Sequence, residues 1–260
     1  MRPPSDLQKI LRRRSHYLRH LRQPRQKRDL VCELDESRST IDRAVRELER
    51  AGFVERGDDG YRTTLAGELA LTEHDRHADR VRGLASFRDL LAELPADASL
   101  DGSLFEDPEV VLPTPHSPRE PVGAIDAVLA DADRARTLGG VVVPEFADAY
   151  SERVLDGGMT AEFVLTEGVV EWLVSRWREQ FRAFLETDGV TAAVTPTERP
   201  FSLVLVDGRE GTEVGVALHV GGSILGFVRN DTAAAVAWAE ETFERARAGA
   251  DSLTGRRLDE

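Results

Sequence analysis

The chain has one cysteine, Cys32, and only two lysines, Lys9 and Lys27. A single cysteine excludes an intrachain disulfide bond and a metal site built from cysteine pairs. Because Cys32 lies beside Val31 in a predicted short helix, we interpret it as a packed thiol rather than a redox sensor. The shortage of lysine, with 47 acidic residues against 34 basic ones, suits a salt-rich cytoplasm in which charges are strongly screened.

Long apolar runs are also missing. None reaches the roughly 18 residues that indicate a transmembrane helix. The charged N-terminus lacks the apolar segment of a signal peptide. We therefore expect a cytoplasmic protein without a membrane partner, and the hydrophobic content of 41% is ample for packed cores.

The sequence contains none of the common catalytic motifs. A P-loop, G-x-S-x-G, G-x-G-x-x-G and H-E-x-x-H are all absent. The H-x-K motif of phospholipase D is excluded, because neither lysine follows a histidine in that spacing. We therefore expect no catalytic residues, no metal site and no cofactor, and we interpret the chain as a protein other than an enzyme.

The basic charge is gathered near the N-terminus, although the net charge of the chain is −13. Residues 1–62 contain 16 basic and 11 acidic residues, whereas the rest of the chain contains 18 basic and 36 acidic ones. A basic segment attached to an acidic body is the charge pattern of a nucleic-acid-binding domain. Salt would weaken its phosphate contacts, so base contacts or dimerisation must offset that loss.

Residues 25–62 predict a helix, a tight turn, a second helix and a two-stranded hairpin. Ser37 can cap the second helix, and Ser39 with Asp42 offers an alternative capping box. The residues that follow have the apolar spacing of one helical face; they are Ile41, Ala44, Val45 and Leu48. The Asp59–Gly60 step between two strand-like runs predicts the hairpin.

A helix-turn-helix places its second helix in the major groove of double-stranded DNA, and the hairpin would be a wing. The face opposite the apolar stripe supplies arginines and short polar side chains, which suit bases and phosphates. The alternative is a small helical core with a solvated charged face. The candidate DNA-binding residues are Lys27, Ser37, Arg38, Ser39, Thr40, Arg43, Arg46, Arg56 and Arg62.

Two further helices flank this motif. Residues 5–22 predict a helix capped by Ser5, with a basic side that is either solvated or directed at phosphates; its arginines are Arg12, Arg13, Arg14, Arg19 and Arg22. Residues 65–94 predict a long helix capped by Thr63 or Thr64, whose apolar seam suits a homodimer contact. Its charged middle includes Glu73, His74 and His77, which we interpret as a solvated face rather than a metal site.

The rest of the chain predicts a second domain, over residues 95–250. Residues 95–121 are rich in Pro, Ser and Asp, and are read as a linker with a strand at 110–112. Beyond them, helices at 121–136, 145–155, 167–187 and 232–248 alternate with strands at 140–143, 160–165 and 190–194. Three more strands, at 201–206, 213–219 and 223–229, suggest an antiparallel meander. The pattern predicts a layered α/β domain with a mixed sheet, followed by a flexible tail at 251–260.

The predicted organisation is therefore a two-domain fold of the α+β or α/β class: a winged helix-turn-helix at 1–64, a linking and dimerisation helix at 65–94, and the α/β domain. Because ligands of open α/β sheets bind beyond the carboxyl ends of strands, polar residues at those ends are candidates for a small-molecule effector pocket. They are Thr114, His116, Ser117, Glu145, Thr166 and Glu167. Helix capping is the ordinary alternative for Ser117 and Thr166.

Four stretches resemble a known family: SRSTIDRAVRELERAGFVE at 37–55, VVVPEFADAYSERVLDGGMTAEFVLTEGVVEWL at 141–173, PFSLVLVDGREG at 200–211 and GFVRNDTAAAVAWAEETFER at 226–245. They resemble the archaeal winged-helix transcriptional regulators with a methanogenesis-regulatory-protein middle domain, whose haloarchaeal members are similar in their acidic, arginine-rich composition. The resemblance implies a homodimeric DNA-binding regulator with a sensor-like C-terminal domain. The alternatives are a protein-interaction module using the winged helix, and a small-molecule enzyme built on the α/β domain.

Overall fold

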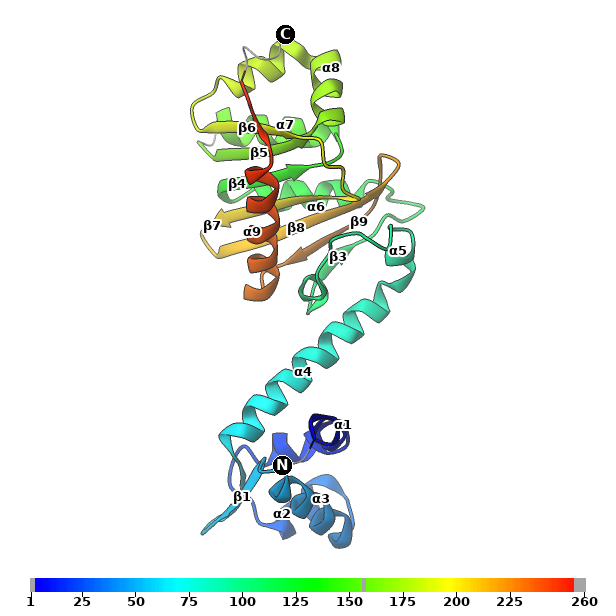
Figure 1. The fold of residues 1–260 in the computed structure, drawn as a ribbon, viewed down its shortest axis with the longest axis vertical. Coiled ribbons are helices and arrows are strands. Elements are labelled where there is room, and N and C mark those ends of the chain that lie inside the picture. The colour runs from blue at the N-terminus through cyan, green and yellow to red at the C-terminus, as the bar shows by residue number, and fades with distance from the viewer. Residues whose placement is uncertain (1–2, 156–157, 255–260) are drawn as a thin grey trace. The chain divides into compact units, whose positions relative to one another are not determined.

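The computed structural model describes residues 3–155 and 158–254, apart from the side chains of Glu145 and Phe146. The chain divides into an N-terminal unit, Met1–Val81, and a C-terminal unit, Arg82–Glu260. The division falls within one helix, α4 (Leu65–Ser86), and Figure 1 labels the elements. The boundary expected at residue 64 therefore differs from the observed one, because the first turns of α4 pack with the N-terminal helices through Leu71.

The N-terminal unit has the element order of a winged helix-turn-helix. It consists of α1 (Pro4–His20), α2 (Lys27–Leu34), α3 (Arg38–Arg50), the hairpin strands β1 (Val54–Gly57) and β2 (Gly60–Thr63), and the start of α4. Its core joins the apolar faces of these helices to the base of the hairpin. The fully buried members include Tyr17, Leu18, Leu30, Ile41, Val45, Leu48 and Leu71.

Local capping signals explain where these helices begin. The Ser37 Oγ accepts a hydrogen bond from the Thr40 N–H at 3.2 Å, so α3 begins at Arg38 and the alternative cap at Ser39 is wrong. Thr64 caps α4 through the Gly67 N–H at 3.1 Å. The predicted cap at Ser5 is wrong, because α1 already begins at Pro4, whose fixed backbone angle suits the first helical position.

The C-terminal unit is built on one mixed sheet of eight strands in the order β10-β6-β5-β4-β7-β8-β9-β3. β4 pairs in parallel with β5, and β5 with β6, whereas the remaining pairs are antiparallel. The strands are β3 (Glu109–Val111), β4 (Ala132–Gly139), β5 (Thr160–Thr166), β6 (Val190–Thr195), β7 (Phe201–Gly208), β8 (Gly211–Val220), β9 (Ser223–Asn230) and β10 (Asp251–Leu253). The mixed sheet and its β7–β9 meander are as predicted.

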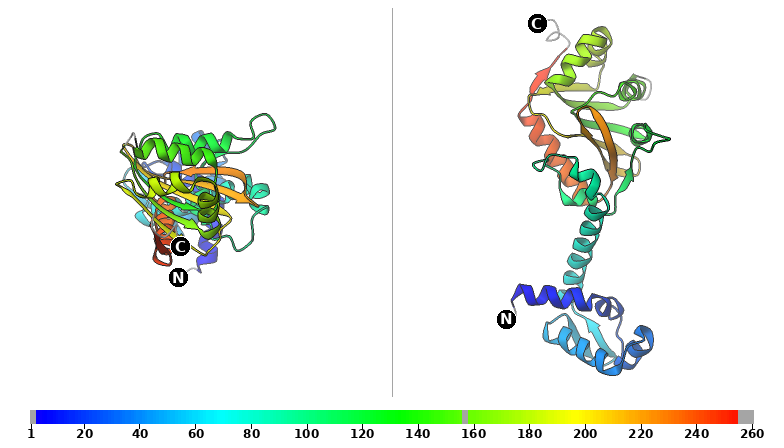
Figure 2. Two further views of the ribbon diagram at one scale, coloured as in Figure 1. Left: turned by 90° about the horizontal axis from the view of Figure 1, so that it is seen from above. Right: turned by 90° about the vertical axis from the view of Figure 1, so that its right-hand side faces the viewer.

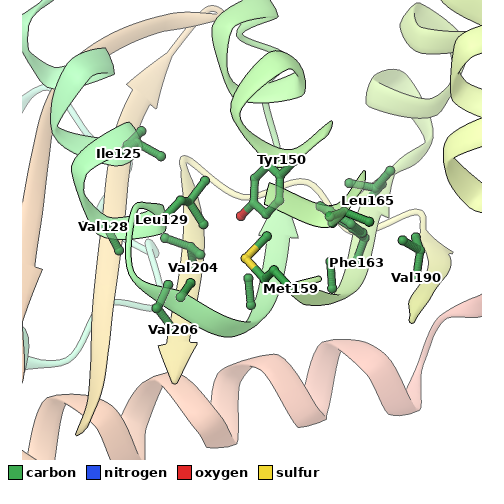
Figure 3. Close-up of a cluster of buried hydrophobic side chains, with 14 of the residues drawn as sticks. Ile125, Val128, Leu129, Tyr150, Met159, Phe163, Leu165, Val190, Val204 and Val206 are labelled. Carbon is green, nitrogen blue, oxygen red and sulfur yellow. The ribbon is translucent and has the colours of Figure 1, made fainter. Parts of the chain in front are cut away.

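Helices cover both faces of this sheet (Figure 2). One face carries α6 (Glu120–Leu129), α7 (Pro144–Leu155) and α8 (Glu167–Leu185), and its core is drawn in Figure 3. The other face packs against α9 (Ala233–Ala248), with α5 (Arg88–Ala92) and the short 3-10 helix η1 (Gly102–Phe105) beside it. The two-domain α+β fold class is thereby confirmed.

The helix expected at 121–136 is present but ends earlier than predicted, and the strand expected at 140–143 is wrong. The helix ends at Leu129, and residues 132–139 form β4, which pairs with β5 on one side and β7 on the other. Pairing on both edges overrides the helical spacing of a short segment. Val141, Val142 and Val143 follow β4 as a loop, not a strand.

Other expected boundaries also shift. The helix predicted at 65–94 is interrupted at Phe87, which separates α4 from α5. The segment expected to be a linker contributes Leu104 and Phe105 to the core, and the Asn230 Nδ2 donates to the Leu104 carbonyl at 3.1 Å. Residues 251–253 are β10 rather than part of a flexible tail, because they pair with β6; residues 255–260 of that predicted tail lie outside the described residues.

Candidate nucleic-acid interface

The exposed face of α3 carries the arginines expected at a DNA interface. Its apolar stripe is buried, which turns Arg38, Arg43 and Arg46 toward solvent. Within residues 3–155 and 158–254, none of these three arginines forms an ion pair. Their positive charges are therefore available to an external anion.

A groove between α1 and α3 extends this surface. It is lined by Arg13, Arg14, Ser39, Asp42, Arg43, Arg46, Glu47 and Arg50. Its two carboxylates already have basic partners, since Arg14 Nε lies 3.1 Å from Glu47 Oε2 and Lys27 Nζ lies 2.9 Å from Asp42 Oδ1. The groove therefore has a net positive charge, which we call the basic groove.

Lys27 is occupied within the protein. Besides its ion pair with Asp42, its Nζ lies 5.0 Å from the centre of the Tyr61 ring, and only 23% of its side chain is exposed. The hydrogen bond from Lys27 lowers the pKa of the Asp42 carboxyl, and the charges of Lys27, Arg46 and Arg38 act in the same direction. Lys27 thus ties α2 to α3 and the wing, and is not a free phosphate contact in this arrangement.

Of the two arginines predicted on the wing, one is paired within the protein and the other is open. Arg62 Nε donates to Glu55 Oε1 at 2.7 Å across the hairpin, where the two residues are register partners. Arg56 is exposed, and its guanidinium lies 6.0 Å from the Tyr61 ring centre. The wing therefore presents one open arginine, Arg56, and one that is paired.

The wing is held by an additional backbone contact. The Arg25 N–H donates to the Tyr61 carbonyl at 3.0 Å, and the Tyr61 N–H donates to the Arg25 carbonyl at 2.9 Å. A side chain at Gly60 would collide with this bridge, because its Cβ would lie 2.5 Å from the Arg25 carbonyl oxygen. The glycine of the Asp59–Gly60 step therefore serves two purposes: it allows the hairpin turn, and it leaves room for the close approach of Arg25, which precedes α2.

Short hydroxyl side chains occupy the start of α3. The Ser37 Oγ lies 2.9 Å from the Ser39 Oγ and 2.8 Å from the Thr40 Oγ1. Ser37 is committed to the helix cap, and Thr40 is half-buried, whereas Ser39 is exposed and lines the basic groove. Among the predicted hydroxyl contacts, Ser39 is the best placed for DNA.

Sequence reasoning did not include Arg13 and Arg50 among the candidate DNA contacts. Both are exposed and line the basic groove. The signal for Arg50 was present, because it lies one turn beyond Arg46 on α3. The basic side of α1 was recognised, but only the packing of α1 against α3 identifies Arg13 as the arginine that faces the groove.

The predicted effector residues do not converge on one pocket. Thr114 and Ser117 bond to each other in an exposed turn, with the Ser117 N–H donating to Thr114 Oγ1 at 3.0 Å. This turn follows β3, which lies four strand spacings from β4, or about 19 Å at the usual strand separation. Thr166 is buried at the end of β5, and Glu167 is exposed.

Helix capping is the alternative role for two of these residues. Thr166 occupies the N-cap position of α8 but makes no side-chain cap bond, and Ser117 lies outside α6, whose N-cap residue is Arg119. His116 is exposed beside Ser117, and the side chain of Glu145 lies outside the described part of the structure.

Cys32, expected to be packed, is exposed on α2, because the helix buries Leu30 instead.

Among the described residues, no group of three or more His, Cys, Asp or Glu side chains is arranged to hold a metal ion, and this includes the region of Glu73, His74 and His77. The described helices include none with the length and apolarity needed to cross a membrane.

A winged helix-turn-helix unit joined to a regulatory α/β unit defines a two-domain transcriptional regulator. The chain belongs to the family of the methanogenesis regulatory protein FilR1, middle domain, whose family model matches residues 118–249. Residues 6–84 match the model of the HVO_A0261 N-terminal domain. The family resemblance inferred from the sequence is thereby confirmed.

Several solved structures are similar to this chain at low identity. TrmBL2, described as an archaeal chromatin protein with a novel mode of DNA binding, is 14% identical, with 96% of this chain and 100% of that chain covered and a TM-score of 0.44. NucT from Helicobacter pylori is 8% identical over 56% of this chain and 99% of that chain, with a TM-score of 0.42. The phospholipase D family member Nuc from Salmonella typhimurium is 13% identical over 57% of this chain and 99% of that chain, with a TM-score of 0.43. These scores carry no conclusion about function, and comparison with curated proteins gives no match.

Proposed function

We propose that this regulator binds specific double-stranded DNA sequences through α3, the basic groove and the wing. The proposal rests on three arginines of α3, Arg38, Arg43 and Arg46, which are exposed and form no ion pair with any described residue, in a chain whose net charge is −13. An acidic protein that leaves these cations open at one helix face is suited to a polyanion.

The residues take different roles in this proposal. Arg38, Arg43 and Arg46 lie on the helix that would enter the major groove, where an arginine bonded to guanine contributes about 1–3 kcal/mol of discrimination. Arg13 on α1 and Arg50 at the C-terminal end of α3 line the basic groove and contact phosphates in this proposal. Arg56 reaches the flanking strand or the minor groove, whereas Lys27 and Arg62 keep their internal partners.

The test is direct binding of the full chain to DNA at several salt concentrations. Fluorescence anisotropy is measured with duplexes selected from a random library, and with scrambled duplexes of equal length and composition. We expect the selected duplexes to bind more tightly, with an affinity that falls as salt rises. Failure to bind any duplex at low salt would overturn the proposal and favour the protein-interaction alternative.

We infer that the regulator is a homodimer that uses α4. Leu65, Leu69 and Val81 are 76%, 61% and 50% exposed on this helix, although they are large apolar residues. Apolar side chains that stay open on a long helix suit a second helix of the same kind. A dimer would also double the number of base contacts, which offsets the weakening of phosphate contacts by salt.

The α/β unit is proposed to sense an effector or to transmit regulation. An enzyme on this unit would call for paired carboxyl groups with strongly shifted pKa values. Burial raises the pKa of one carboxyl group of this unit, Asp126 on α6. The regulatory family of the middle domain supports a regulatory role rather than catalysis.

A further inference from the structure

A cavity of about 170 Å³ lies in the C-terminal unit, between the sheet and the helices α6, α7 and α8. Aromatic and aliphatic side chains form its walls, and the described lining residues include no charged side chain. The principal walls are Val142, Tyr150, Phe163, Leu173, Trp177 and Phe184. Figure 3 shows Tyr150 and Phe163 within the surrounding core.

The floor of the cavity exists because small residues occupy the covered face of the sheet. Gly139, Ala192, Gly215 and Ala217 line it from four different positions on β4, β6 and β8. At Gly215 a larger residue has no room, since its Cβ would lie 2.4 Å from the Phe227 Cζ. Helices that pack over such a floor leave space that their own side chains do not fill.

The loop after β4 also belongs to the cavity. Val141, Val142 and Val143 are half-buried and line it. Loops usually run over the surface and carry polar residues, so three consecutive valines in a loop call for an explanation. A dry cavity wall supplies that explanation, and it accounts for the segment that resembled a buried strand.

α8 is interrupted where it passes the cavity. Trp177 has φ −138° and ψ 37°, which breaks the helix between its two halves. Its ring packs edge-on against Trp172 with 5.0 Å between the ring centres. The second half of α8 brings Phe181 and Phe184 to the cavity wall, so the break fits these aromatic rings around the space.

The polar groups at the wall include a pair of hydroxyl groups that satisfy each other. The hydroxyls of Thr137 and Tyr150 bond to each other, and burial raises the pKa of Tyr150, so the phenol stays neutral. A charged ligand would find no counter-charge among the described lining residues. An apolar engineered cavity of about 150 Å³ holds benzene, so the space fits one aromatic ring.

We propose that this cavity is a binding site for a small uncharged aromatic molecule the size of toluene. The cavity would be the site at which the α/β unit binds its effector. Its regulatory meaning rests on the sensing role proposed above for that unit. It replaces the effector pocket expected from strand ends. The ring of the ligand packs against Tyr150, Phe163 and Trp177, and the loop at Val142 with the broken helix α8 forms the cover.

The test uses the full chain, toluene as the probe and no DNA. Toluene should change tryptophan emission saturably and raise the melting temperature, since a ligand bound only by the folded state stabilises it. Glycerol at equal concentration should do neither. Because this experiment contains no DNA, a failure to bind toluene would overturn the cavity proposal and would not bear on DNA binding. In the same way, a failure to bind DNA would not bear on the cavity proposal.

Matched variants locate the site. Ala192→Leu fills the cavity and should weaken toluene binding by at least about tenfold, whereas Ala193→Leu adds the same atoms on the other face of β6 and should not. Unchanged binding by Ala192→Leu would overturn the site. Should that variant fail to fold, nuclear Overhauser effects in the native chain decide: contacts from toluene to the Tyr150 ring support the site, and contacts only elsewhere overturn it.

Discussion

Lys27 Nζ lies 2.9 Å from Asp42 Oδ1, and this pair joins α2 to the helix proposed to read DNA. Asp42 is one of the two carboxylates of the basic groove, and its pKa is lowered: the hydrogen bond from Lys27 is the main cause, and the charges of Arg46 and Arg38 add to it. The pair thus withholds one negative and one positive charge from any ligand of the groove. Its disruption should change DNA binding in a predictable direction.

Asp42→Ala should tighten DNA binding and steepen its salt dependence. The substitution removes a carboxylate from the groove and frees Lys27 to reach a phosphate, which adds about 0.9 to the slope of log affinity against log salt. Anisotropy titrations over a salt series measure both effects. Glu210→Ala removes an exposed carboxylate from the C-terminal unit and serves as the control. Weaker binding by Asp42→Ala would contradict the expected electrostatics.

Arg43→Ala should weaken binding to a selected duplex by about 1–3 kcal/mol and reduce discrimination against the scrambled one. The reason is the loss of an unpaired guanidinium from the exposed face of α3. Arg209→Ala is the matched control, because it removes the same charge from an exposed turn of the other unit. Equal affinities of native chain and Arg43→Ala, with circular dichroism unchanged, would remove Arg43 from the interface.

Arg13→Ala should weaken binding to selected and scrambled duplexes alike. A phosphate contact carries no sequence information, so its loss should lower the salt slope by about 0.9 without changing discrimination. Arg12→Ala is the control, since Arg12 is also exposed on α1 but does not line the groove. If Arg13→Ala reduced the discrimination between selected and scrambled duplexes, Arg13 would contact a base rather than a phosphate. If Arg13→Ala and Arg12→Ala gave identical results, the groove side of α1 would make no contribution to DNA binding.

Leu69→Asp should shift the chain from dimer to monomer. The substitution places a charge on the exposed apolar part of α4, where Leu69 is 61% exposed. Size-exclusion chromatography with light scattering measures the mass in solution. Leu155→Asp makes the same substitution at a leucine of similar exposure, 62%, on α7 of the C-terminal unit, and should leave the dimer intact. A native chain that is already monomeric would rule out the α4 dimer.

His219 should make the C-terminal unit less stable in acid. Its side chain is buried, and burial lowers the pKa of the imidazole below its usual value of 6.5. The unfolded chain therefore binds the proton more readily. The stability is fully present above pH 6.5 and is lost as the pH falls toward the folded-state pKa.

Urea unfolding of the native chain and of His219→Gln on both sides of pH 6.5 measures this contribution. The free energy of unfolding of the native chain should fall more steeply toward acid than that of the variant. The native chain and the variant differ only at position 219. The neighbouring Ser202, whose Oγ lies 3.4 Å from His219 Nε2, is the same in both proteins. Parallel curves for the two proteins would exclude His219 as the cause.

Local signals were sufficient for the N-terminal unit and for much of the sheet. The Ser37 cap, the apolar stripe of α3 and the Asp59–Gly60 turn each act within a few residues, so the sequence alone predicted the winged helix-turn-helix. The same holds for the β7–β9 meander, whose strands are joined by tight turns. Such features depend on short-range backbone geometry.

Features that depend on distant partners were decided only by the tertiary structure. β4 is a strand because β5 and β7 flank it, and the valines after it lie in a loop that lines a cavity. Lys27 and Arg62 looked like free cations, yet Asp42 and Glu55 pair with them, while Arg13 joins the groove through the packing of α1. The sequence determined which charges and apolar faces exist; three-dimensional packing determined which of them remain unpartnered, because pairing depends on proximity in space.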